Sequence, residues 1–218
     1  MIQFGLWDIA RNLALAARWT IALSLAAFVL GGAVGLAILF ARTSRSLWLR
    51  RAASTHIELF QGTPLLMQLF LSFFGLSLVG IETSAWSAAA VALTLWTSAF
   101  LAEIWRGCVE GIPGGQWDAS ASLAMSHLQQ MRHVVLPQAL RIAIPPTVGF
   151  AVQVIKGTAL ASIIGFVEVS KASTMITNAS FKPFTVYGMA ALIYLALCLP
   201  LSMCSRHLER RLHVAHRD

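Results

Sequence analysis

Five long apolar runs dominate the pattern of hydrophobic and polar positions along the chain. They cover residues 20–41, 59–81, 83–102, 142–167 and 183–205. A helix needs about 20 predominantly apolar residues to cross the hydrocarbon core of a bilayer. Each run reaches that length, so the pattern predicts an all-α, polytopic membrane protein with five transmembrane helices.

The composition agrees with a lipid environment. Hydrophobic residues make up 57% of the 218 residues, charged residues only 11%, and the mean hydropathy is +0.72. The net charge of +7 would also suit a nucleic-acid-binding protein, but the Lys and Arg residues gather between the apolar runs. That placement is typical of membrane topology and argues against nucleic acid as a partner.

The basic residues also predict the orientation of the chain. Eleven follow the first, third or fifth run: Arg42, Arg45, Arg50, Arg51, Arg106, Arg132, Arg141, Arg206, Arg210, Arg211 and Arg217. The opposite side receives four: Arg11, Arg18, Lys171 and Lys182. Basic residues accumulate in the cytoplasm, so we expect the N-terminus outside and the C-terminus inside.

We expect three parts along the chain: an external or interfacial segment at 1–18, one transmembrane domain at 19–208, and a basic cytoplasmic tail at 209–218. The first apolar run is too long for the apolar region of a signal peptide, so we interpret it as a retained span.

Catalytic and metal chemistry is not indicated. The three cysteines form no CxxC pair, and the tail histidines His207, His213 and His216 are irregularly spaced without a carboxylate or thiol to complete a ligand set. The sequence contains no GxxxxGK[ST] phosphate loop, so we do not expect this chain to hydrolyse ATP itself. We predict no catalytic site, metal or cofactor of its own for this chain.

The predicted cytoplasmic connection at 107–140 is too long for a simple turn. A turn is marked by Gly111, Pro113, Gly114 and Gly115. Residues 116–123 then have a helical pattern. Ser126, with Gln129 three positions later, forms a capping box that predicts a second helix, which we expect Pro137 to end.

Residues 116–126 of this connection read QWDASASLAMS, and residues 135–141 read VLPQALR. They resemble the EAA loop of ABC importer permeases, whose pattern is Glu-Ala-Ala, a glycine four residues later, and Leu-Pro further on. The predicted coupling residues are Asp118, Ala119, Ser120, Ala124, Ser126, Leu136 and Pro137. In that family the loop packs into a groove on the cytoplasmic ATPase subunit, so the resemblance implies the same contact here. A hairpin that merely covers the ends of the spans is the alternative.

Three of these positions depart from the family pattern. Asp118 replaces Glu, Ser120 replaces Ala, and Ala124 replaces Gly. Asp118 keeps a negative charge in the early turns of its helix, where the helix dipole favours it. A left-handed turn residue other than glycine costs about 1 to 2 kcal/mol, so we expect Ala124 either to reshape the turn or to carry that cost.

Three further segments read ELFQGTPLLMQLF at 58–70, AEIWRG at 102–107 and KGTALASIIG at 156–165. They are similar to permeases for polar amino acids and opines, and the whole resemblance covers about residues 20–211. It implies a type I ABC permease of the bacterial inner membrane that imports a polar amino acid. Gln61 stands where arginine is common in that family, and Gly157 and Ala159 stand where a polar residue and serine are common.

Lys156 lies inside a predicted span. An ammonium there costs at least about 2.5 to 3.5 kcal/mol on insertion scales, so we expect it to face the subunit interior or a wet cavity. It could bind a substrate carboxylate, or it could pair with another chain's carboxylate or with backbone carbonyls. Glu168 is not its expected partner, because it lies about 18 Å further along a straight helix.

The predicted substrate pathway comprises Lys156, Thr158, Gln61, Thr63 and Glu168. Thr158, Gln61 and Thr63 could instead hydrogen-bond between packed helices. We expect Pro64, Pro145 and Pro146 to break or kink their helices. Glu103 and Arg106, three positions apart, are expected to form a local ion pair.

The resemblance implies several partners: a second permease subunit, identical or homologous, two cytoplasmic ATPase subunits that use ATP and Mg, and a periplasmic solute-binding protein. Two alternatives stay open, namely an ABC permease with a non-amino-acid cargo and an ion-gradient-driven carrier or channel. The sequence contains no internal repeat and a single central lysine, which favours an ABC permease over the carrier.

Overall fold

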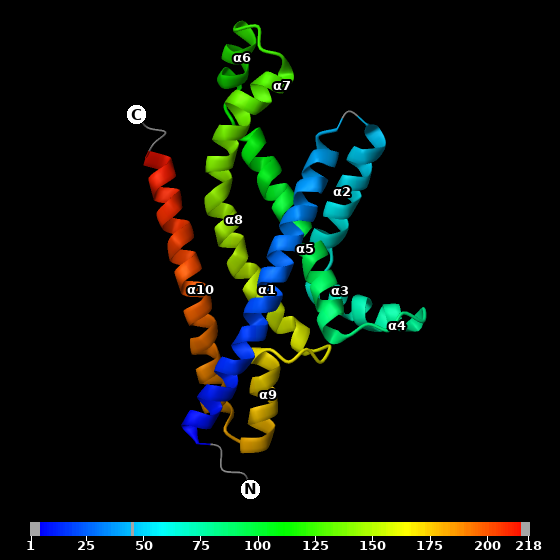
Figure 1. Ribbon diagram of the computed structural model, residues 1–218, viewed down its shortest axis with the longest axis vertical. Coiled ribbons are helices and arrows are strands. Elements are labelled where there is room, and N and C mark those ends of the chain that lie inside the picture. Colours follow the sequence, from blue (N-terminus) through cyan, green and yellow to red (C-terminus); the bar gives the residue numbers. More distant parts are fainter. Residues whose placement is uncertain (1–4, 45, 215–218) are drawn as a thin grey trace.

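The computed structural model describes residues 5–44 and 46–214, and this part of the chain is almost entirely helical, without a strand. Figure 1 shows long helices running along the molecule. They are α1 (Leu6–Arg42), α5 (Ala85–Glu110), α8 (Leu136–Thr158) and α10 (Pro183–Val214). Their apolar composition explains this shape, because a helix satisfies all its internal backbone polar groups without water.

The two ends of the molecule carry different short helices (Figure 1). At one end, α6 (Gly114–Ser122) and α7 (His127–Gln130) form a hairpin near the C-terminal end of α10. At the other end, α9 (Val169–Ser180) packs beside the N-terminal part of α1. The predicted external and cytoplasmic connections therefore lie at opposite ends of the bundle.

Within residues 5–44 and 46–214, four helical stretches are long and apolar enough to cross a membrane: Leu6–Arg42, Ala85–Glu110, His127–Ser162 and Pro183–Leu212. A fifth candidate is a helix pair, Leu47–Gly62 with Leu65–Leu78, which bends by 105°. Counting that pair as one span gives five. The predicted all-α fold with five membrane-spanning segments is confirmed in this sense.

The first and last helices are longer than their apolar runs. α1 begins at Leu6, so most of the predicted segment 1–18 is helical and continuous with the first span. The reason is tertiary packing, since Ile9 and Leu13 are fully buried in a cluster with residues of α9 and α10. α10 continues through residue 214 of the predicted tail, and residues 215–218 lie outside the described part of the chain.

The second predicted span, 59–81, is wrong in its boundaries. The helix α2 (Leu47–Gly62) begins twelve residues earlier and ends before Pro64, as the predicted break requires. The chain then continues at the 105° bend through α3 (Leu65–Phe70), the π-helical turn η1 (Leu71–Gly75) and α4 (Leu76–Leu78). Proline lacks a backbone N–H and clashes with the preceding turn, so the straight helix cannot pass this point.

The fourth predicted span, 142–167, begins too late and ends too late. Helical structure is continuous over His127–Ser162 and includes the π-helical turn η2 (Met131–Val135) and the 3-10 turn η3 (Ala159–Ser162). The prediction that Pro137 ends the second hairpin helix is therefore wrong. The π-helical turn η2 ends just before α8 begins at Leu136, so Pro137 falls in the first turn of α8, where proline is tolerated.

Pro145 and Pro146 lie inside α8, and neither breaks it. Here α8 packs against α10, where the Ser205 hydroxyl donates to the Pro145 carbonyl at 2.8 Å. Gly149 supplies the space for that contact, because a Cβ there would lie 3.1 Å from the Ser205 Oγ. This hydrogen bond therefore joins α8 to α10 beside the two prolines.

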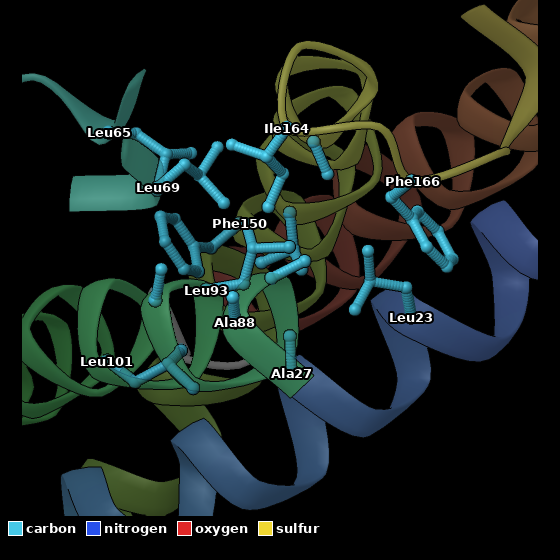
Figure 2. Packing of buried hydrophobic residues seen from close by; sticks show 14 residues of the cluster. Leu23, Ala27, Leu65, Leu69, Ala88, Leu93, Leu101, Phe150, Ile164 and Phe166 are labelled. Atoms are coloured by element: carbon cyan, nitrogen blue, oxygen red, sulfur yellow. The ribbon is translucent and has the colours of Figure 1, made fainter. Parts of the chain in front are cut away.

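The main core lies where α1, α3, α5 and α8 meet (Figure 2). Figure 2 shows Leu23 and Ala27 of α1 facing Leu93 of α5, with Phe150 of α8 and Leu69 of α3 closing the cluster. The described residues after η3 also contribute, through Ile164 and Phe166. This packing holds the bent second span against the fourth.

Glycine allows α1 to approach α5 unusually closely. A Cβ on Gly31 would lie 2.6 Å from the Thr97 Cγ2, and one on Gly35 would lie 3.0 Å from the Ser98 carbonyl oxygen. Real Cβ atoms do not approach heavy atoms at 2.6 Å. In membranes small residues drive helix association by permitting such contact, so these two positions fix how the first and third spans pack.

Candidate functional site

A small apolar core joins the hairpin to the spans. Its buried members are Ile112, Val135 and Ala139. Trp117 of α6 packs against this core, and its ring stacks with the ring of His127 at 5.9 Å between centroids. The predicted coupling residue Ser120 is buried on the same side and donates to the Trp117 carbonyl at 2.9 Å. Because the core includes residues of α8 and of the segment after α5, the hairpin packs directly against the ends of the third and fourth spans.

The turn of the hairpin is a left-handed helix end. Ala124 has φ +56°, its N–H donates to the Ala121 carbonyl at 2.9 Å, and the Met125 N–H donates to the Ser120 carbonyl at 3.3 Å. These two bonds form a Schellman motif, in which glycine is the usual left-handed residue. The turn therefore keeps the glycine geometry, and Ala124 carries the cost that we expected as one of two outcomes.

The capping box predicted at the start of the second hairpin helix is present. The Gln129 N–H donates to the Ser126 Oγ at 3.4 Å, and the Ser126 N–H donates to the Gln129 Oε1 at 2.8 Å. This reciprocal pair satisfies two backbone donors at the helix end. It holds the turn in place immediately after the strained residue.

The outer surface of the hairpin combines acidic and apolar groups. The coupling residues Asp118 and Ala119 are exposed on α6, and Leu136 and Pro137 are exposed where α8 begins. Sequence reasoning missed two apolar side chains beside the turn. Leu123 is 77% exposed and Leu128 is 76% exposed. Two large exposed leucines on a short polar hairpin favour a protein-binding surface. Their positions beside the left-handed turn at Ala124 could have indicated this surface from the sequence.

An ion-pair cluster stiffens the adjoining end of α5. Arg106 pairs with the predicted partner Glu103 and also with Glu110, which the sequence analysis did not single out. The Arg106 Nε donates to the Glu103 Oε2 at 2.9 Å. Glu110 lies four positions after Arg106, which is the ordinary spacing for such a pair on a helix.

Lys156 lies in the last turn of α8 with its side chain exposed. Gln153, three positions earlier and therefore on the same face, is also exposed. Within the described residues Lys156 forms no ion pair. An ammonium exposed on one face of a span requires either a partner chain or water beside it. Thr158, by contrast, is fully buried, and its hydroxyl donates to the Ile155 carbonyl at 2.7 Å.

Gln61 and Thr63 lie at the break between α2 and α3. The Gln61 Nε2 donates to the Ala99 carbonyl of α5 at 3.2 Å, and the Thr63 hydroxyl donates to the Leu59 carbonyl at 2.7 Å. Gln68, whose role the sequence did not reveal, donates to the Thr63 carbonyl at 3.1 Å and to its Oγ1 at 2.9 Å. Gln68 also donates to the Phe60 carbonyl at 3.0 Å, which loses its helical donor because Pro64 has no N–H, whereas the Gln61 bond joins the break to α5.

The structure brings the second-span break next to the end of α8. A Cβ on Gly157 would lie 3.1 Å from the Leu65 side chain of α3, so the two segments touch at glycine. Thr63 precedes this contact by two residues, and Lys156 and Thr158 adjoin Gly157 in the chain. The break and the end of α8 thus share one region of the fold, and the Thr158 hydroxyl also lies beside Tyr194, which binds Glu168.

Glu168 belongs to a different environment, which the sequence did not reveal. Its carboxylate is fully buried and caps α9, accepting from the Ser170 and Lys171 N–H groups at 2.7 and 3.0 Å. The other oxygen accepts from the Tyr194 hydroxyl at 2.6 Å and the Thr20 hydroxyl at 3.3 Å. Four donors compensate the burial of this carboxyl group and join α1, α9 and α10.

Comparisons with known proteins find relatives among membrane transport proteins. A family model described as the inner membrane component of binding-protein-dependent transport systems matches residues 33–214. A Bacillus subtilis protein, described as the probable amino-acid ABC transporter permease YckA, is 36% identical over 88% of this chain and 85% of its own length. The L-cystine transport system permease TcyB of Bacillus subtilis is 33% identical over 97% of this chain and 90% of its own.

A solved structure is similar in fold as well as in sequence. It is described as the crystal structure of an amino acid ABC transporter with histidines, and one of its chains is 32% identical with a TM-score of 0.89. The match covers 92% of this chain and 94% of that chain. Most of this chain therefore has a fold shared with a transporter.

Proposed function

This chain belongs to the family of inner membrane components of binding-protein-dependent transport systems, and we propose that it imports a polar amino acid as the permease subunit of an ATP-driven importer. It is a transport subunit, and ATP hydrolysis in this family resides in a separate subunit. The cargo proposal is supported by the similarity to permeases named for amino acids and cystine. The observation that carries the function is the hairpin with Asp118, Leu123 and Leu128 on its outer surface.

The complete importer contains another membrane subunit and the ATPase. In its finer form, the proposal comprises a second permease, identical or homologous, two cytoplasmic ATPase subunits that use ATP and Mg, and an external solute-binding protein. The bare face of α8 at Gln153 and Lys156 supports the second permease, because lipid is a costly neighbour for an ammonium. The exposed leucines of the hairpin support the ATPase contact.

The chain is oriented with the N-terminus outside and the C-terminus in the cytoplasm. Eleven basic residues against four favour this orientation, and the hairpin and the C-terminal end of α10 lie at the same end of the bundle (Figure 1). Figure 1 places the N-terminal end of α1 and α9 at the opposite end, where a solute-binding protein would dock.

The substrate pathway passes the face of α8 that carries Gln153 and Lys156. Thr158, Gln61 and Thr63 belong to it as residues around the contact between α3 and α8. The ammonium of Lys156 faces the carboxylate of the cargo, and the amide of Gln153 adds a donor and an acceptor one turn away. Glu168 contributes to the pathway by holding α9, since its carboxylate ties that helix to α1 and α10.

Charge reversal on the hairpin tests the coupling role. Asp118→Lys should reduce amino acid uptake in proteoliposomes at least tenfold relative to the ATP hydrolysed, because a lysine replaces the carboxylate on the docking surface. The same reversal at exposed Glu82, in the connection between α4 and α5, is the control and should leave the ratio unchanged. Equal ratios for the two variants, or uptake by the wild type without added ATP, would defeat the proposal.

Removal of the lysine charge tests the pathway. Lys156→Met should weaken amino acid uptake or its apparent affinity while the complex still assembles, because the side-chain length is nearly kept and the ammonium is lost. Lys171→Met on α9 is the matched control and should transport normally. A Lys156→Met complex that cannot be purified would instead assign Lys156 to subunit packing. Stimulation of ATPase activity by a panel of amino acids, with the binding protein present, tests the cargo class separately.

A further inference from the structure

An apolar groove lies between the first part of α1 and α9, at the end of the bundle opposite the hairpin. Its volume is about 450 Å³. Leu15 and Trp19 of α1 form one wall, Met175 and Ala179 of α9 form the other, and Val167, just before α9, joins the lining. Neither the predicted pathway nor the coupling hairpin uses this groove.

An aromatic cluster closes the groove on the membrane side. A second hollow, which shares Trp19 and Val167 with the groove, is completed by Trp86 and Phe166. The Trp86 ring lies 6.0 Å from the Trp19 ring and 5.4 Å from the Phe166 ring, centroid to centroid. Each of these three aromatic residues lies within three positions of the outer end of an apolar run. Tryptophan is enriched at the membrane–water interface, so the cluster marks the level of the lipid headgroups.

The groove extends from this cluster away from the bilayer. The apolar run of α1 covers residues 20–41, a length of about 33 Å at 1.5 Å per residue, which matches the hydrocarbon core of about 30 Å. Leu15 therefore lies about 8 Å and Asn12 about 12 Å outside the core along the helix. The headgroup region adds only about 5 to 8 Å on each side. The open part of the groove is thus in water, on the external side in the proposed orientation.

Apolar side chains line the groove although it faces water. Leu15, Val167 and Met175 are each about half exposed, and nothing in the described part of the chain covers them. A contiguous apolar surface of this kind with a polar rim is typical of a protein-binding site. An acyl chain cannot be the occupant, because it would have to leave the bilayer to reach Leu15 and Met175.

The rim of the groove on α1 is basic. Arg11 lies one turn before Leu15 and Arg18 one turn after it, so the three side chains share a face of the helix. Both arginines are exposed, and neither forms an ion pair within the described residues. Asp8, one turn before Arg11, accepts from the Gly5 N–H at 3.1 Å instead. The partner surface that fits this rim is therefore acidic, with an apolar side chain for the groove.

The charge of the rim argues against a second copy of this chain as the occupant. In a symmetric contact an identical subunit would bring its own Arg11 and Arg18 to the same place, and like charges would repel. The proposed importer has one other partner on the external side, the solute-binding protein. The family model that matches this chain describes transport that depends on such a protein.

We infer that the groove between α1 and α9 is a docking site for the solute-binding protein, which places an apolar side chain between Leu15 and Met175 and acidic side chains near Arg11 and Arg18. This inference rests on the proposed function, whose external partner it locates. Glu168 ties α9 to α1 and α10, so a protein bound in the groove contacts an element that is joined directly to two spans.

Binding of the solute-binding protein to the purified transporter complex in lipid nanodiscs tests the groove. The solute-binding protein of the same importer is loaded with its amino acid, and the Kd is measured by biolayer interferometry. Met175→Asp should raise the Kd about tenfold or more, because a carboxylate then occupies the apolar groove and repels an acidic partner. Thr174→Asp adds the same charge at an exposed position on another face of α9 and should leave the Kd unchanged.

Arg11→Gln tests the basic rim. It should lower the association rate about threefold at low salt, and the difference should fade at high salt because exposed charges are screened. Arg51→Gln removes the same charge at the hairpin end of the molecule and should leave association unchanged. Ala179→Trp fills the groove without adding charge and should also weaken binding, so it replaces Met175→Asp if that complex does not assemble.

The outcomes separate the groove from the importer function. A Kd that is unchanged in Met175→Asp and Ala179→Trp, or raised equally by Thr174→Asp, would overturn the inference and leave the importer function intact. Loss of the second permease from both groove variants would assign the groove to subunit pairing and would also overturn it. A wild-type complex that binds no solute-binding protein would overturn the proposed function as well.

Discussion

Ala124→Gly should stabilise the hairpin, although it removes a methyl group. Ala124 has φ +56°, so its cost is one of backbone conformation. A left-handed residue other than glycine costs about 1 to 2 kcal/mol. Glycine recovers that cost but loses about 0.5 to 1 kcal/mol through the greater freedom of the unfolded chain. Subtracting the centres of these two ranges gives an expected net gain of about 0.7 kcal/mol for closing the turn.

Amide hydrogen exchange across the hairpin measures this gain. The N–H groups of Ala124 and Met125, which close the Schellman motif, report on the turn directly. A gain of about 0.7 kcal/mol corresponds to about a threefold slower exchange in this segment. Amides in the first part of α10, at the other end of the molecule, should exchange at the wild-type rate and provide the internal reference.

Ala119→Gly is the control with the opposite sign. Ala119 is an exposed residue inside α6 with ordinary helical geometry, so glycine there should destabilise the helix by about 1 kcal/mol. Exchange should then be faster than in the wild type. If Ala124→Gly also accelerated exchange, or left it unchanged, backbone strain at this turn would not be the energetic feature we describe.

Two further substitutions test the packing of the bundle. Gly31→Ala should lower the free energy of unfolding by about 1 to 3 kcal/mol through overpacking against α5. Gly32→Ala should be nearly neutral, because the heavy atom nearest to its Cβ would be 3.8 Å away. Equal midpoints of the two variants in denaturant titrations would refute the close contact. Tyr194→Phe should cost about 1.5 to 3 kcal/mol because the buried Glu168 loses a charged hydrogen bond. Tyr187→Phe removes an exposed hydroxyl that lies 3.3 Å from the Thr174 hydroxyl. It should cost less than Tyr194→Phe when both variants are compared by thermal unfolding. The reverse order would contradict the role of Tyr194 in binding Glu168.

The local patterns of the sequence were sufficient for the number of spans, for the hairpin and for its capping box. Each depends on residues close together in the chain: about 20 apolar positions in a row, or Ser126 followed by Gln129. The strain at Ala124 was also foreseeable, because a glycine position in the resembling loop implied a left-handed residue. The break at Pro64 followed from the missing N–H of proline alone.

Helix boundaries required the tertiary structure. Ile9 and Leu13 extend α1 beyond its apolar run because α9 and α10, more than 150 residues later in the chain, bury them. Pro137 ought to end a helix by local rules, yet the turn η2 and the packing of Val135 and Ala139 carry the helix past it. Local preference is weak compared with the burial of an apolar face, so contacts decided these ends.

The environments of single polar residues depended most on the fold. Lys156 and Glu168 are both ionisable residues near one apolar run, and the sequence placed both in one pathway. In the folded chain Lys156 is exposed beside Gln153, whereas four donors from three helices enclose Glu168. A charge can be buried only where donors converge on it, and the donors come from positions that only chain folding brings together.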